Sequence, residues 1–323
     1  MTTANGAPHA SDIDAIRAAR RRIDPFAHRT PVATSATLDA ISARRLWFKC
    51  ELLQRTGSFK FRGATNAVRL LSDEAAAHGV VTHSSGNHAQ ALALAARMRG
   101  ITAHVVMPSN SAAVKKAAVR DYGGRVVECE PTLEARESTA ARVIAETGAT
   151  MIPPYNHPDV IAGQGTVALE LLDECPQLDA IVVPLGGGGL ISGIAIAAKA
   201  LKPSIRIIGA EPALAGDAAL SKAKGAIEPA MPPVTIADGL RTSLGTLTFP
   251  VVRDLVDEIV LVSEEEIAAH MRLAWERMKL TIEPSAAVGV AVACGGWMRA
   301  QRGLDDVGVI LCGGNVDLAA LPW

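Results

Sequence analysis

The sequence has few aromatic residues and no excess of either charge. Phe, Trp and Tyr make up 3% of the 323 residues, so we expect no platform on which nucleotide bases stack. Lys and Arg number 32 against 33 Asp and Glu, which gives a net charge of -1. Because no global positive field is present, we expect the chain to bind neither nucleic acid nor an anionic membrane surface.

Paired cysteines are also lacking. The 5 cysteines are scattered and odd in number. This pattern is typical of a reduced cytoplasmic protein, and it argues against a disulfide framework. Residues 1–22 contain no apolar core of a secretory signal, so we expect a cytoplasmic location.

One apolar run, residues 180–198, has the length of a membrane span. Pro184 and a run of glycines interrupt it, so we interpret it as a buried strand, a glycine loop and a buried helix. Hydrophobic residues make up 49% of the chain, enough for a sizeable core. A chain of 323 residues suits one large domain or two coupled domains.

Strand-like and helix-like segments alternate along the chain. Strands are predicted at 80–83, 102–107, 125–129, 180–184, 205–210 and 307–311, and helices at 89–98, 112–122, 133–147, 166–175 and 190–201. A βαβα order predicts an α/β fold of parallel strands covered by helices. A capping-box pattern opens another helix at Ser263, and prolines and glycines indicate a long irregular segment at 224–250.

Lys60 is the candidate nucleophile. It lies in an apolar-periodic segment two residues after Ser58, which we expect to be the N-cap of a helix. The positive end of the helix dipole, together with burial, lowers the pKa of such an amine and frees it to form a Schiff base. A surface lysine between Phe59 and Phe61 is the alternative, and the local sequence alone leaves it open.

A run of glycines, Gly186, Gly187, Gly188 and Gly189, follows one predicted strand and precedes a helix. Glycines let backbone N–H groups converge on an anion, and the helix dipole assists. The run matches neither a Walker A loop nor a G-x-G-x-x-G fingerprint. A tight turn would need only one glycine, so we favour a phosphate site. A phosphate site and a reactive lysine together suggest pyridoxal 5'-phosphate.

A polar segment, Ser84, Ser85, Asn87 and His88, lies between a predicted strand and a predicted helix. Its hydroxyl, amide and backbone N–H groups can hold a carboxylate or a phenolic oxygen. An ordinary N-cap serine is the alternative. No third ligand is spaced with His83 and His88, so we do not expect them to bind a metal.

Several sequence blocks, in order, resemble serine racemase and its threonine and serine dehydratase relatives. These are fold-type-II pyridoxal phosphate enzymes, like the tryptophan synthase β subunit. The likeness runs from about residue 13 to residue 318. The blocks that carry it are Ser58-Phe59-Lys60, Thr82-His83-Ser84-Ser85-Gly86-Asn87-His88, Ile161-Ala162-Gly163-Gln164-Gly165-Thr166, the glycine run, Thr235-Ile236-Ala237-Asp238-Gly239 and Gly313-Gly314-Asn315-Val316-Asp317-Leu318.

The resemblance implies a role for each candidate residue. Lys60 would bind the cofactor covalently, and the glycine run would hold its phosphate. The remaining cofactor contacts would come from Phe59, Asn87, Glu283 and Cys312. The substrate would be bound by Ser84, Ser85, Asn87, His88, Arg136 and Ser243. A divalent cation, Mg²⁺, Mn²⁺ or Ca²⁺, would be bound by Glu211, Ala215 and Asp217, for which two solvated surface acids are the alternative.

Two positions bear on the reaction type. In the racemases, a serine at the position of Ser85 exchanges the α-proton on the face opposite the lysine, so this chain is equipped for chemistry on both faces. Cys312 stands where the racemases usually carry serine, facing the pyridine nitrogen. A thiol is a weak donor and leaves that nitrogen largely neutral, which favours β-elimination over transamination.

We therefore expect a two-domain α/β enzyme with a large domain at 1–79 and 157–323 and a small domain at 80–156. The expected reaction is dehydration of L-serine or L-threonine to a 2-keto acid and ammonia, with serine racemisation as a further activity. If Arg136 reaches the substrate, L-threo-3-hydroxyaspartate is an alternative substrate. A β-replacement synthase and a non-enzymatic nucleotide-binding module are the rival classes. The resemblance also implies a homodimer and allows a nucleotide effector.

Overall fold

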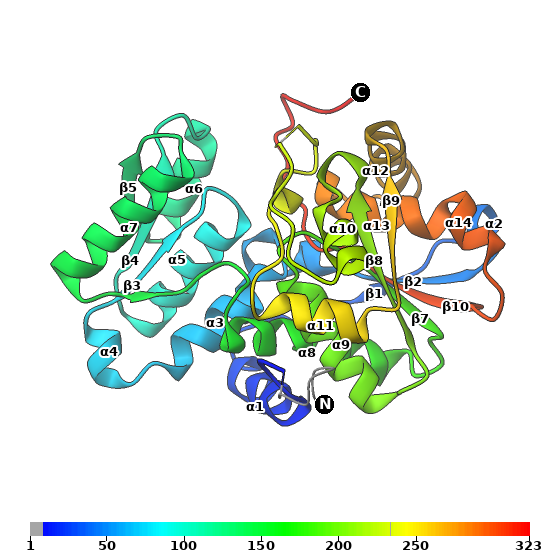
Figure 1. Cartoon of the computed structure of the whole chain (residues 1–323), viewed down its shortest axis with the longest axis horizontal. Coiled ribbons are helices and arrows are strands. Elements are labelled where there is room, and N and C mark those ends of the chain that lie inside the picture. Colours follow the sequence, from blue (N-terminus) through cyan, green and yellow to red (C-terminus); the bar gives the residue numbers. More distant parts are fainter. Residues whose placement is uncertain (1–8, 233) are drawn as a thin grey trace.

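The computed structural model describes residues 9–232 and 234–323 and contains two sheets (Figure 1). In the six-stranded sheet the order is β1-β2-β10-β7-β8-β9, and in the four-stranded sheet it is β5-β4-β3-β6. The strands are β1 (Val32–Ala33), β2 (Arg45–Lys49), β3 (Val80–His83), β4 (Ala103–Pro108), β5 (Arg125–Cys129), β6 (Thr150–Met151), β7 (Ala180–Pro184), β8 (Arg206–Pro212), β9 (Glu258–Val262) and β10 (Asp306–Ile310).

Neighbouring strands pair in parallel except β1 and β2, which are antiparallel. The helices are α1 (Ile13–Ile23), α2 (Ala36–Ser42), α3 (Lys60–Leu70), α4 (Asp73–Ala77), α5 (Asn87–Arg99), α6 (Ala113–Asp121), α7 (Leu133–Thr147), α8 (Pro158–Glu174), α9 (Gly189–Leu201), α10 (Asp217–Lys224), α11 (Thr248–Leu255), α12 (Glu264–Met278), α13 (Pro284–Cys294) and α14 (Gly296–Ala300). The expected α/β class with mostly parallel sheets is confirmed.

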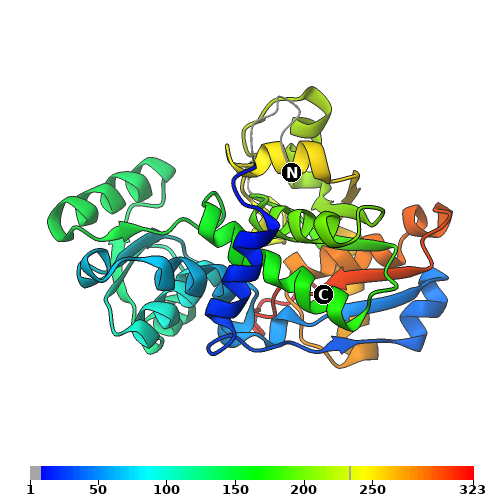
Figure 2. The same ribbon diagram turned by 90° about the horizontal axis from the view of Figure 1, so that it is seen from below.

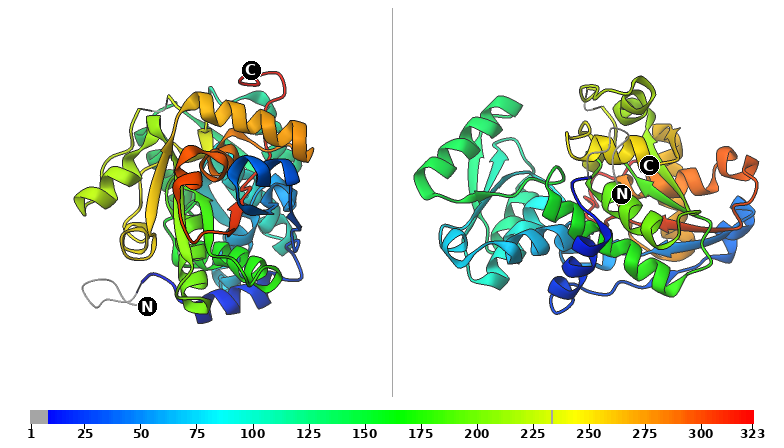
Figure 3. Two further views of the ribbon diagram at one scale, coloured as in Figure 1. Left: turned by 90° about the vertical axis from the view of Figure 1, so that its right-hand side faces the viewer. Right: turned by 60° about the horizontal axis from the view of Figure 1, so that its bottom comes forward.

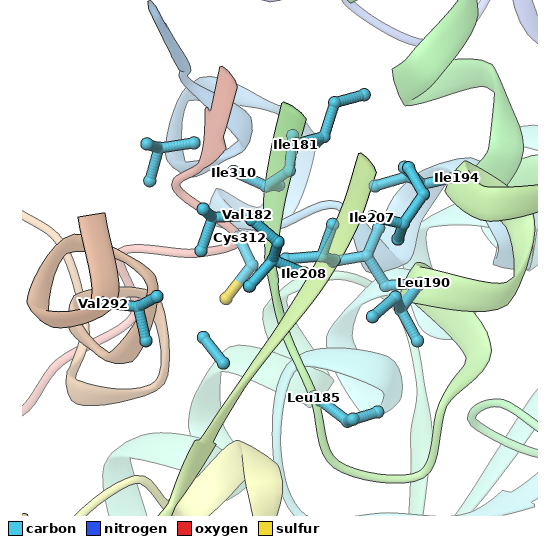
Figure 4. Packing of buried hydrophobic residues seen from close by; sticks show 14 of the residues in the cluster. Ile181, Val182, Leu185, Leu190, Ile194, Ile207, Ile208, Val292, Ile310 and Cys312 are labelled. Carbon is cyan, nitrogen blue, oxygen red and sulfur yellow. The ribbon is translucent and has the colours of Figure 1, made fainter. Parts of the chain in front are cut away.

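We call residues 80–151, with the four-stranded sheet, the small lobe, and the part built on the six-stranded sheet the large lobe. The two lobes stand side by side (Figures 2 and 3), and α1 packs on the large lobe beside α8, with Ile16 and Ala19 in its core. The strands β7, β8 and β10 supply the centre of the large core, and Figure 4 shows Ile181, Ile207 and Cys312 within this one cluster. The proposed domain boundaries at 79/80 and 156/157 lie close to the ends of the small lobe and stay a prediction.

Helix α3 links the lobes. Its apolar residues, including Phe61 and Ala64, pack in one cluster with Val80 and Leu92 of the small lobe. On another side α3 crosses α8 so closely that a Cβ atom on Gly163 would lie 2.6 Å from the Cα of Gly63. The first residue of α3 is Lys60, so the candidate nucleophile lies where the two lobes meet.

Most predicted elements are present, with two corrections. Ser58 is not the N-cap of α3, because Phe59 occupies that position and Ser58 is drawn into a β-bridge with Gly313. The helix expected at 166–175 begins earlier, at Pro158, because proline at the first helical position is pre-organised for a helix start. The capping box at Ser263 is confirmed.

The apolar run 180–198 contains β7, the glycine loop and most of α9, as interpreted. Within the described ranges, no helix is long and apolar enough to cross a membrane. The segment 224–250 is largely irregular, with one short turn at Asp238–Leu240 before α11 begins at Thr248. Four strands were missed: β1, β2, β6 and β9. Strands β1 and β6 have only two residues each. Strands β2 and β9 each begin with a charged residue and contain partly exposed positions, so neither shows a clear apolar run.

Candidate active site

The backbone before Lys60 is fixed to the segment that follows β10. The Phe59 N–H donates to the Cys312 carbonyl at 3.0 Å, and Ser58 pairs with Gly313. The Lys60 Nζ donates to the carbonyl of Pro154 at 2.8 Å and lies 5.0 Å from the centre of the Phe59 ring. Lys60, Phe59 and Cys312 therefore come together, as predicted, at the carboxyl end of β10.

Burial lowers the pKa of the Lys60 amine from 10.5 to about 8, against smaller opposing effects of Cys312 and Glu283. At pH 7 such a pKa leaves about 10% of the amine uncharged, whereas an ordinary lysine leaves less than about 0.1%. The predicted direction is thus confirmed, and desolvation is its main cause. A partly deprotonated amine is what nucleophilic attack on an aldehyde requires.

The glycine loop leads into the N-terminus of α9. Gly186, Gly187 and Gly188 are buried, and none of their N–H groups makes a hydrogen bond to another described residue. Gly188 has φ +85°, and as N-cap of α9 it has no side-chain capping bond. Buried, unpaired N–H groups at a helix N-terminus fit a phosphate group.

Neighbouring residues also require glycine in this loop. A Cβ atom on Gly187 would lie 2.6 Å from the ring of Tyr155, and one on Gly186 would lie 2.8 Å from the Cα of Leu240. Close packing therefore explains why these positions have no side chain. It does not explain the buried, unpaired N–H groups, which need an acceptor such as an anion.

Asn87 and Glu283 connect the two lobes. Asn87 begins α5 in the small lobe, and its Nδ2 donates to both carboxylate oxygens of Glu283 at 2.9 and 3.1 Å. Glu283 is the N-cap of α13 in the large lobe and is 4% exposed. Asn315, after β10, donates from its Nδ2 to Asn87 Oδ1 at 2.8 Å and from its backbone N–H to Glu283 Oε2 at 3.2 Å.

Two further groups near Lys60 are held close to neutral. Burial raises the pKa of Glu283 to about 7, although the Asn87 hydrogen bond favours the ionised form. Burial and the carboxyl of Glu283 raise the pKa of the Cys312 thiol well above its usual value, so the thiol stays protonated. The surroundings of Lys60 are therefore of low polarity and hold little fixed charge.

The polar segment lies between β3 and α5, as predicted, with Ser84 and Ser85 both partly buried. The Ser84 hydroxyl accepts a weak hydrogen bond from the Gly86 N–H at 3.4 Å. His88 is 2% exposed, and burial and the charge of Lys60 lower its pKa to about 3, so the ring is neutral. Its Nε2 lies 2.9 Å from the Ile152 carbonyl and donates to it, which leaves the buried Nδ1 an acceptor with no partner in the described structure.

Two predicted substrate residues, Arg136 and Ser243, lie outside this group. The Arg136 Nε donates to the Thr132 carbonyl of its own helix at 3.3 Å, and its charge contributes to lowering the pKa of His83 at the end of β3. Ser243 is partly buried in the segment before α11, and its hydroxyl makes no hydrogen bond to a described residue. Their roles in substrate binding stay predictions.

Sequence reasoning missed Asn315, Pro154 and Tyr155. Asn315 was quoted as part of a motif without a role, although its place after a terminal parallel strand was a usable signal. Pro154 and Tyr155 lie in the connection between β6 and α8. No sequence pattern marks that connection, because β6, which precedes it, has only two residues. The connection was considered only as the place of the domain boundary at 156/157.

The expected metal ligands are close in the chain and buried. Glu211 is 1% exposed and Asp217 2% exposed, so the alternative of solvated surface acids is wrong. Both Glu211 oxygens accept N–H groups at the start of α10, from Ala218 at 2.8 Å and Ala219 at 2.9 Å. The Asp217 Oδ2 is buried without a partner, which fits a cation, and Ala215 is buried beside it in sequence. The described residues contain no cluster of three acidic, His or Cys ligands.

A partly buried lysine with a lowered pKa, a glycine loop at a helix N-terminus and parallel sheets in two lobes define an α/β enzyme class that binds a phosphorylated aldehyde. The chain belongs to the pyridoxal-phosphate dependent enzyme family, whose model matches residues 23–313. A serine racemase from Arabidopsis thaliana is 53% identical over 98% of this chain and 97% of its own length.

Solved structures agree with this assignment. A maize serine racemase superposes with a TM-score of 0.94 at 50% identity, covering 96% of this chain and 95% of its own. A threonine deaminase, also of known structure, gives a TM-score of 0.90 at 42% identity, covering 96% of this chain and 100% of its own. The resemblance to the serine racemase and threonine dehydratase group is thus confirmed, and so is the fold-type-II architecture.

Proposed function

We propose that this enzyme acts on L-serine and related β-hydroxy amino acids, eliminating water to yield a 2-keto acid and ammonia and also interconverting the two enantiomers of serine. The observation that carries this proposal is Lys60, a partly buried amine with a pKa of about 8 that lies near Glu283. It is bonded to Pro154, whose neighbour Tyr155 packs on the glycine loop. The names of the relatives support serine as substrate, and the threonine deaminase neighbour supports the ammonia-lyase activity.

The residues present fit the cofactor. The unpaired N–H groups of Gly186, Gly187, Gly188 and Gly189 would hold its phosphate, and Asn87 would donate to its phenolic oxygen. Lys60 would hold it covalently with Phe59 alongside. When bound, pyridoxal phosphate supplies a sink for the electron pair that remains at the substrate Cα once the α-proton has left.

Proton transfer falls to two residues of the chain. Released from the cofactor by the substrate amine, the Lys60 Nζ would accept the α-proton from one side, for which its lowered pKa suits it. The Ser85 hydroxyl would exchange a proton on the opposite side, which inversion at Cα requires. The Ser84 hydroxyl would donate to the substrate carboxylate. His88, whose free Nδ1 is an acceptor, would support this binding indirectly, because its bond to the Ile152 carbonyl fixes the start of α5.

The neutral Cys312 thiol favours elimination. A protonated thiol beside the ring is a weak donor, so it would not stabilise a positive charge on the pyridine nitrogen. A weaker electron sink would favour loss of a β-leaving group as the α-proton departs. Transamination would be disfavoured on the same ground.

The proposal also includes a metal ion, a partner subunit and an effector. Mg²⁺, Mn²⁺ or Ca²⁺ at Glu211, Ala215 and Asp217 is supported by the buried, unpaired Asp217 oxygen. A homodimer, a nucleotide effector and a cytoplasmic location are predictions that rest on the family resemblance and the composition.

L-threo-3-hydroxyaspartate is a second candidate substrate. The charge of Arg136 acts on His83 at the end of β3, and the one hydrogen bond of its side chain goes to a backbone carbonyl in the described structure. Its planar fork could therefore take the second carboxylate of this substrate. A β-replacement synthase would need a second-substrate site, and nothing found near Lys60 supports one.

The test is an assay of keto acid and of D-serine with L-serine, L-threonine, D-serine and L-threo-3-hydroxyaspartate, on the parent and on Lys60→Ala. We expect the parent to absorb at about 410–420 nm, as lysine-bound pyridoxal phosphate does. Lys60→Ala should lose this absorbance and at least about 10³-fold in turnover, because both covalent binding and proton transfer vanish. Full activity in Lys60→Ala, with cofactor still reducible onto the protein, contradicts the proposal.

A further inference from the structure

Behind Lys60 lies a buried cluster of charges that the proposed reaction does not use. We call it the charge cluster: Lys49, Glu51, Arg62 and Glu170. The exposed fractions of Lys49, Glu51 and Arg62 are 0%, and that of Glu170 is 4%. With two cations and two anions the cluster is neutral. It joins the end of β2, the turn after it, the first turn of α3 and the C-terminal part of α8.

Arg62 occupies the centre of the charge cluster. Its Nε and Nη2 donate to Glu51 at 2.7 and 2.8 Å, and its Nη1 and Nη2 donate to Glu170 at 2.6 and 2.8 Å. The guanidinium thus binds two carboxylates bidentately. This planar arrangement fixes direction as well as distance, which the single ammonium of a lysine cannot do.

The outer members hold the two carboxylates in place. The Lys49 Nζ lies 2.8 Å from Glu170 Oε2 and donates to the Thr30 carbonyl at 2.6 Å. The Thr30 hydroxyl donates to Glu51 Oε1 at 2.6 Å. Burial alone would raise the pKa of Glu170, but Arg62 and Lys49 outweigh it and lower that pKa, so the carboxylate is ionised.

Such a cluster is a poor source of stability, because desolvation offsets most of the attraction between buried charges. Its geometry offers a different use. Successive residues of an α-helix are rotated by about 100°, so Arg62 and Lys60 project from nearly opposite sides of α3. Whatever fixes the rotation of α3 through Arg62 also fixes the direction of Lys60.

The neighbouring contacts limit the other motions of this turn. The Gly63 N–H donates to Gln164 Oε1 of α8 at 3.2 Å, and the close crossing of Gly63 and Gly163 prevents α3 from moving toward α8. Phe59 is fixed to Cys312 by its backbone bond. The fork of Arg62 adds a restraint on rotation of α3 about its own axis.

We propose that Arg62 is a positioning residue for Lys60: its fork, held by Glu51 and Glu170, sets the rotation of the first turn of α3 and thus the direction of the Lys60 amine. The inference rests on the proposed role of Lys60 as the cofactor-binding lysine. It assigns the charge cluster a mechanical role, because neither Arg62 nor Lys49 is among the groups that shift the pKa of Lys60.

The test compares Arg62→Lys, which keeps the charge and removes the fork, with Met298→Ala as a matched control. Met298 is 0% exposed and lies on α14, away from α3 (Figure 1), so its truncation destabilises the core without touching the charge cluster. Four quantities are measured on each: Tm, kcat and KM for L-serine, circular dichroism of the bound cofactor, and the pH midpoint of cofactor capture by the cofactor-free protein.

We expect Arg62→Lys to lower kcat about 10- to 100-fold, the loss expected for misplacing a reacting group by about 1 Å, with KM changed less. The cofactor dichroism should fall as well, because it reports ring orientation. The pH midpoint of capture should stay where it is in the parent. Met298→Ala should lower Tm and leave kcat and dichroism near those of the parent. Equal kcat and dichroism in the two variants at equal loss of Tm would overturn the inference.

Thr30→Val provides a milder version should Arg62→Lys not fold. It removes the 2.6 Å hydrogen bond to Glu51 and keeps the shape of the side chain. We expect the same pattern, with kcat lowered about 3-fold for one lost hydrogen bond. A kcat equal to that of the parent would contradict the inference. Borohydride reduction of the parent, followed by peptide mapping, separates the two levels: label on a lysine other than Lys60 defeats the proposed function itself, whereas label on Lys60 leaves only the role of Arg62 in question.

Discussion

At the scale of single residues, the chemistry depends on how burial sets protonation. Burial brings the pKa of Lys60 to about 8 and that of Glu283 to about 7, and it lowers the pKa of His88 to about 3. All three shifts favour the neutral form of the group. At neutral pH the site therefore offers a partly free amine and a neutral imidazole acceptor in surroundings of low polarity.

The first prediction concerns the pH dependence of cofactor capture. A lysine whose pKa is lowered by burial becomes a free amine as the pH rises through that lowered value, so capture of pyridoxal phosphate by the cofactor-free protein should accelerate through a midpoint near pH 8. Stopped-flow absorbance measures the rate, and N-acetyl-lysine amide is the control, with a midpoint of about 10.4. A midpoint for the protein equal to that of the control would show that Lys60 is not desolvated.

The second prediction separates the two activities by residue. Ser85→Ala should abolish formation of D-serine and keep most dehydration of L-serine, because only inversion needs a proton donor on the face opposite Lys60. The expected loss of racemisation is about 10²- to 10⁴-fold, as for removal of a general acid. Chiral chromatography and a keto-acid assay measure the two rates. Ser84→Ala is the control and should weaken both activities alike. If Ser85→Ala also weakens both alike, the serine supports geometry only.

The residues that sequence could identify are those that sit in distinctive loops. The glycine run and the segment around Asn87 follow parallel strands, so their place at one edge of a sheet could be predicted from the order of strands and helices. Arg62 could not be identified in this way. Its partners Glu51 and Glu170 are 11 and 108 residues away in the chain, and a charged residue is expected at the surface unless its partners are known.

At the scale of elements, strands were predicted best where turn residues bound them. Strands β3 and β7 match their predicted ranges and are almost entirely buried, and β5, though only partly buried, also matches because Gly124 precedes it and Pro131 follows it. Strand β9 is only partly buried along most of its length and was missed. The start of α8 was also missed, because His157, which caps it, is not among the preferred N-cap residues, and Gly163 and Gly165 lower the helix propensity of its first half.

The third prediction belongs to α10 and the turn before it. Glu211 caps the start of α10, and Asp217 is its first residue, so a cation bound here would tie β8 to the helix. Chelation with EDTA should lower Tm and activity together, and Mg²⁺ or Mn²⁺ should restore both. A metal at about 100 times its Kd stabilises the fold by about 2.7 kcal/mol. Asp217→Asn should behave like the chelated parent and not respond to EDTA. If EDTA changes neither quantity in the parent, the two acids serve structure alone.

At the scale of the whole molecule, the site is completed only when the two lobes meet. Asn87 of the small lobe reaches Glu283 and Asn315 of the large lobe. Lys60 contacts Pro154, in the segment that leaves the small lobe. The α/β class followed from the order of strands and helices, and the division into two domains followed from the family resemblance. The contacts between lobes did not, because they depend on loop conformations that only tertiary packing decides.

The last prediction concerns an ion pair that spans the two lobes. The Lys115 Nζ of α6 lies 2.7 Å from Asp238 Oδ2 in the large lobe, with both side chains partly exposed. Lys115→Glu would place two acids together and oppose the approach of the lobes, so KM for L-serine should rise about 5-fold, in line with a surface pair of about 1 kcal/mol. Steady-state kinetics at low and high salt measure this, and the effect should shrink with added salt because exposed charges are screened. The reversed pair, Lys115→Glu with Asp238→Lys, should return KM to within about 2-fold of the parent.

Arg142→Glu is the control, because Arg142 pairs with Glu146 at 2.9 Å within one exposed helix of the small lobe. Failure of the reversed pair to restore KM, or an equal rise in Arg142→Glu, would show that the bridge between the lobes has no part in bringing them together.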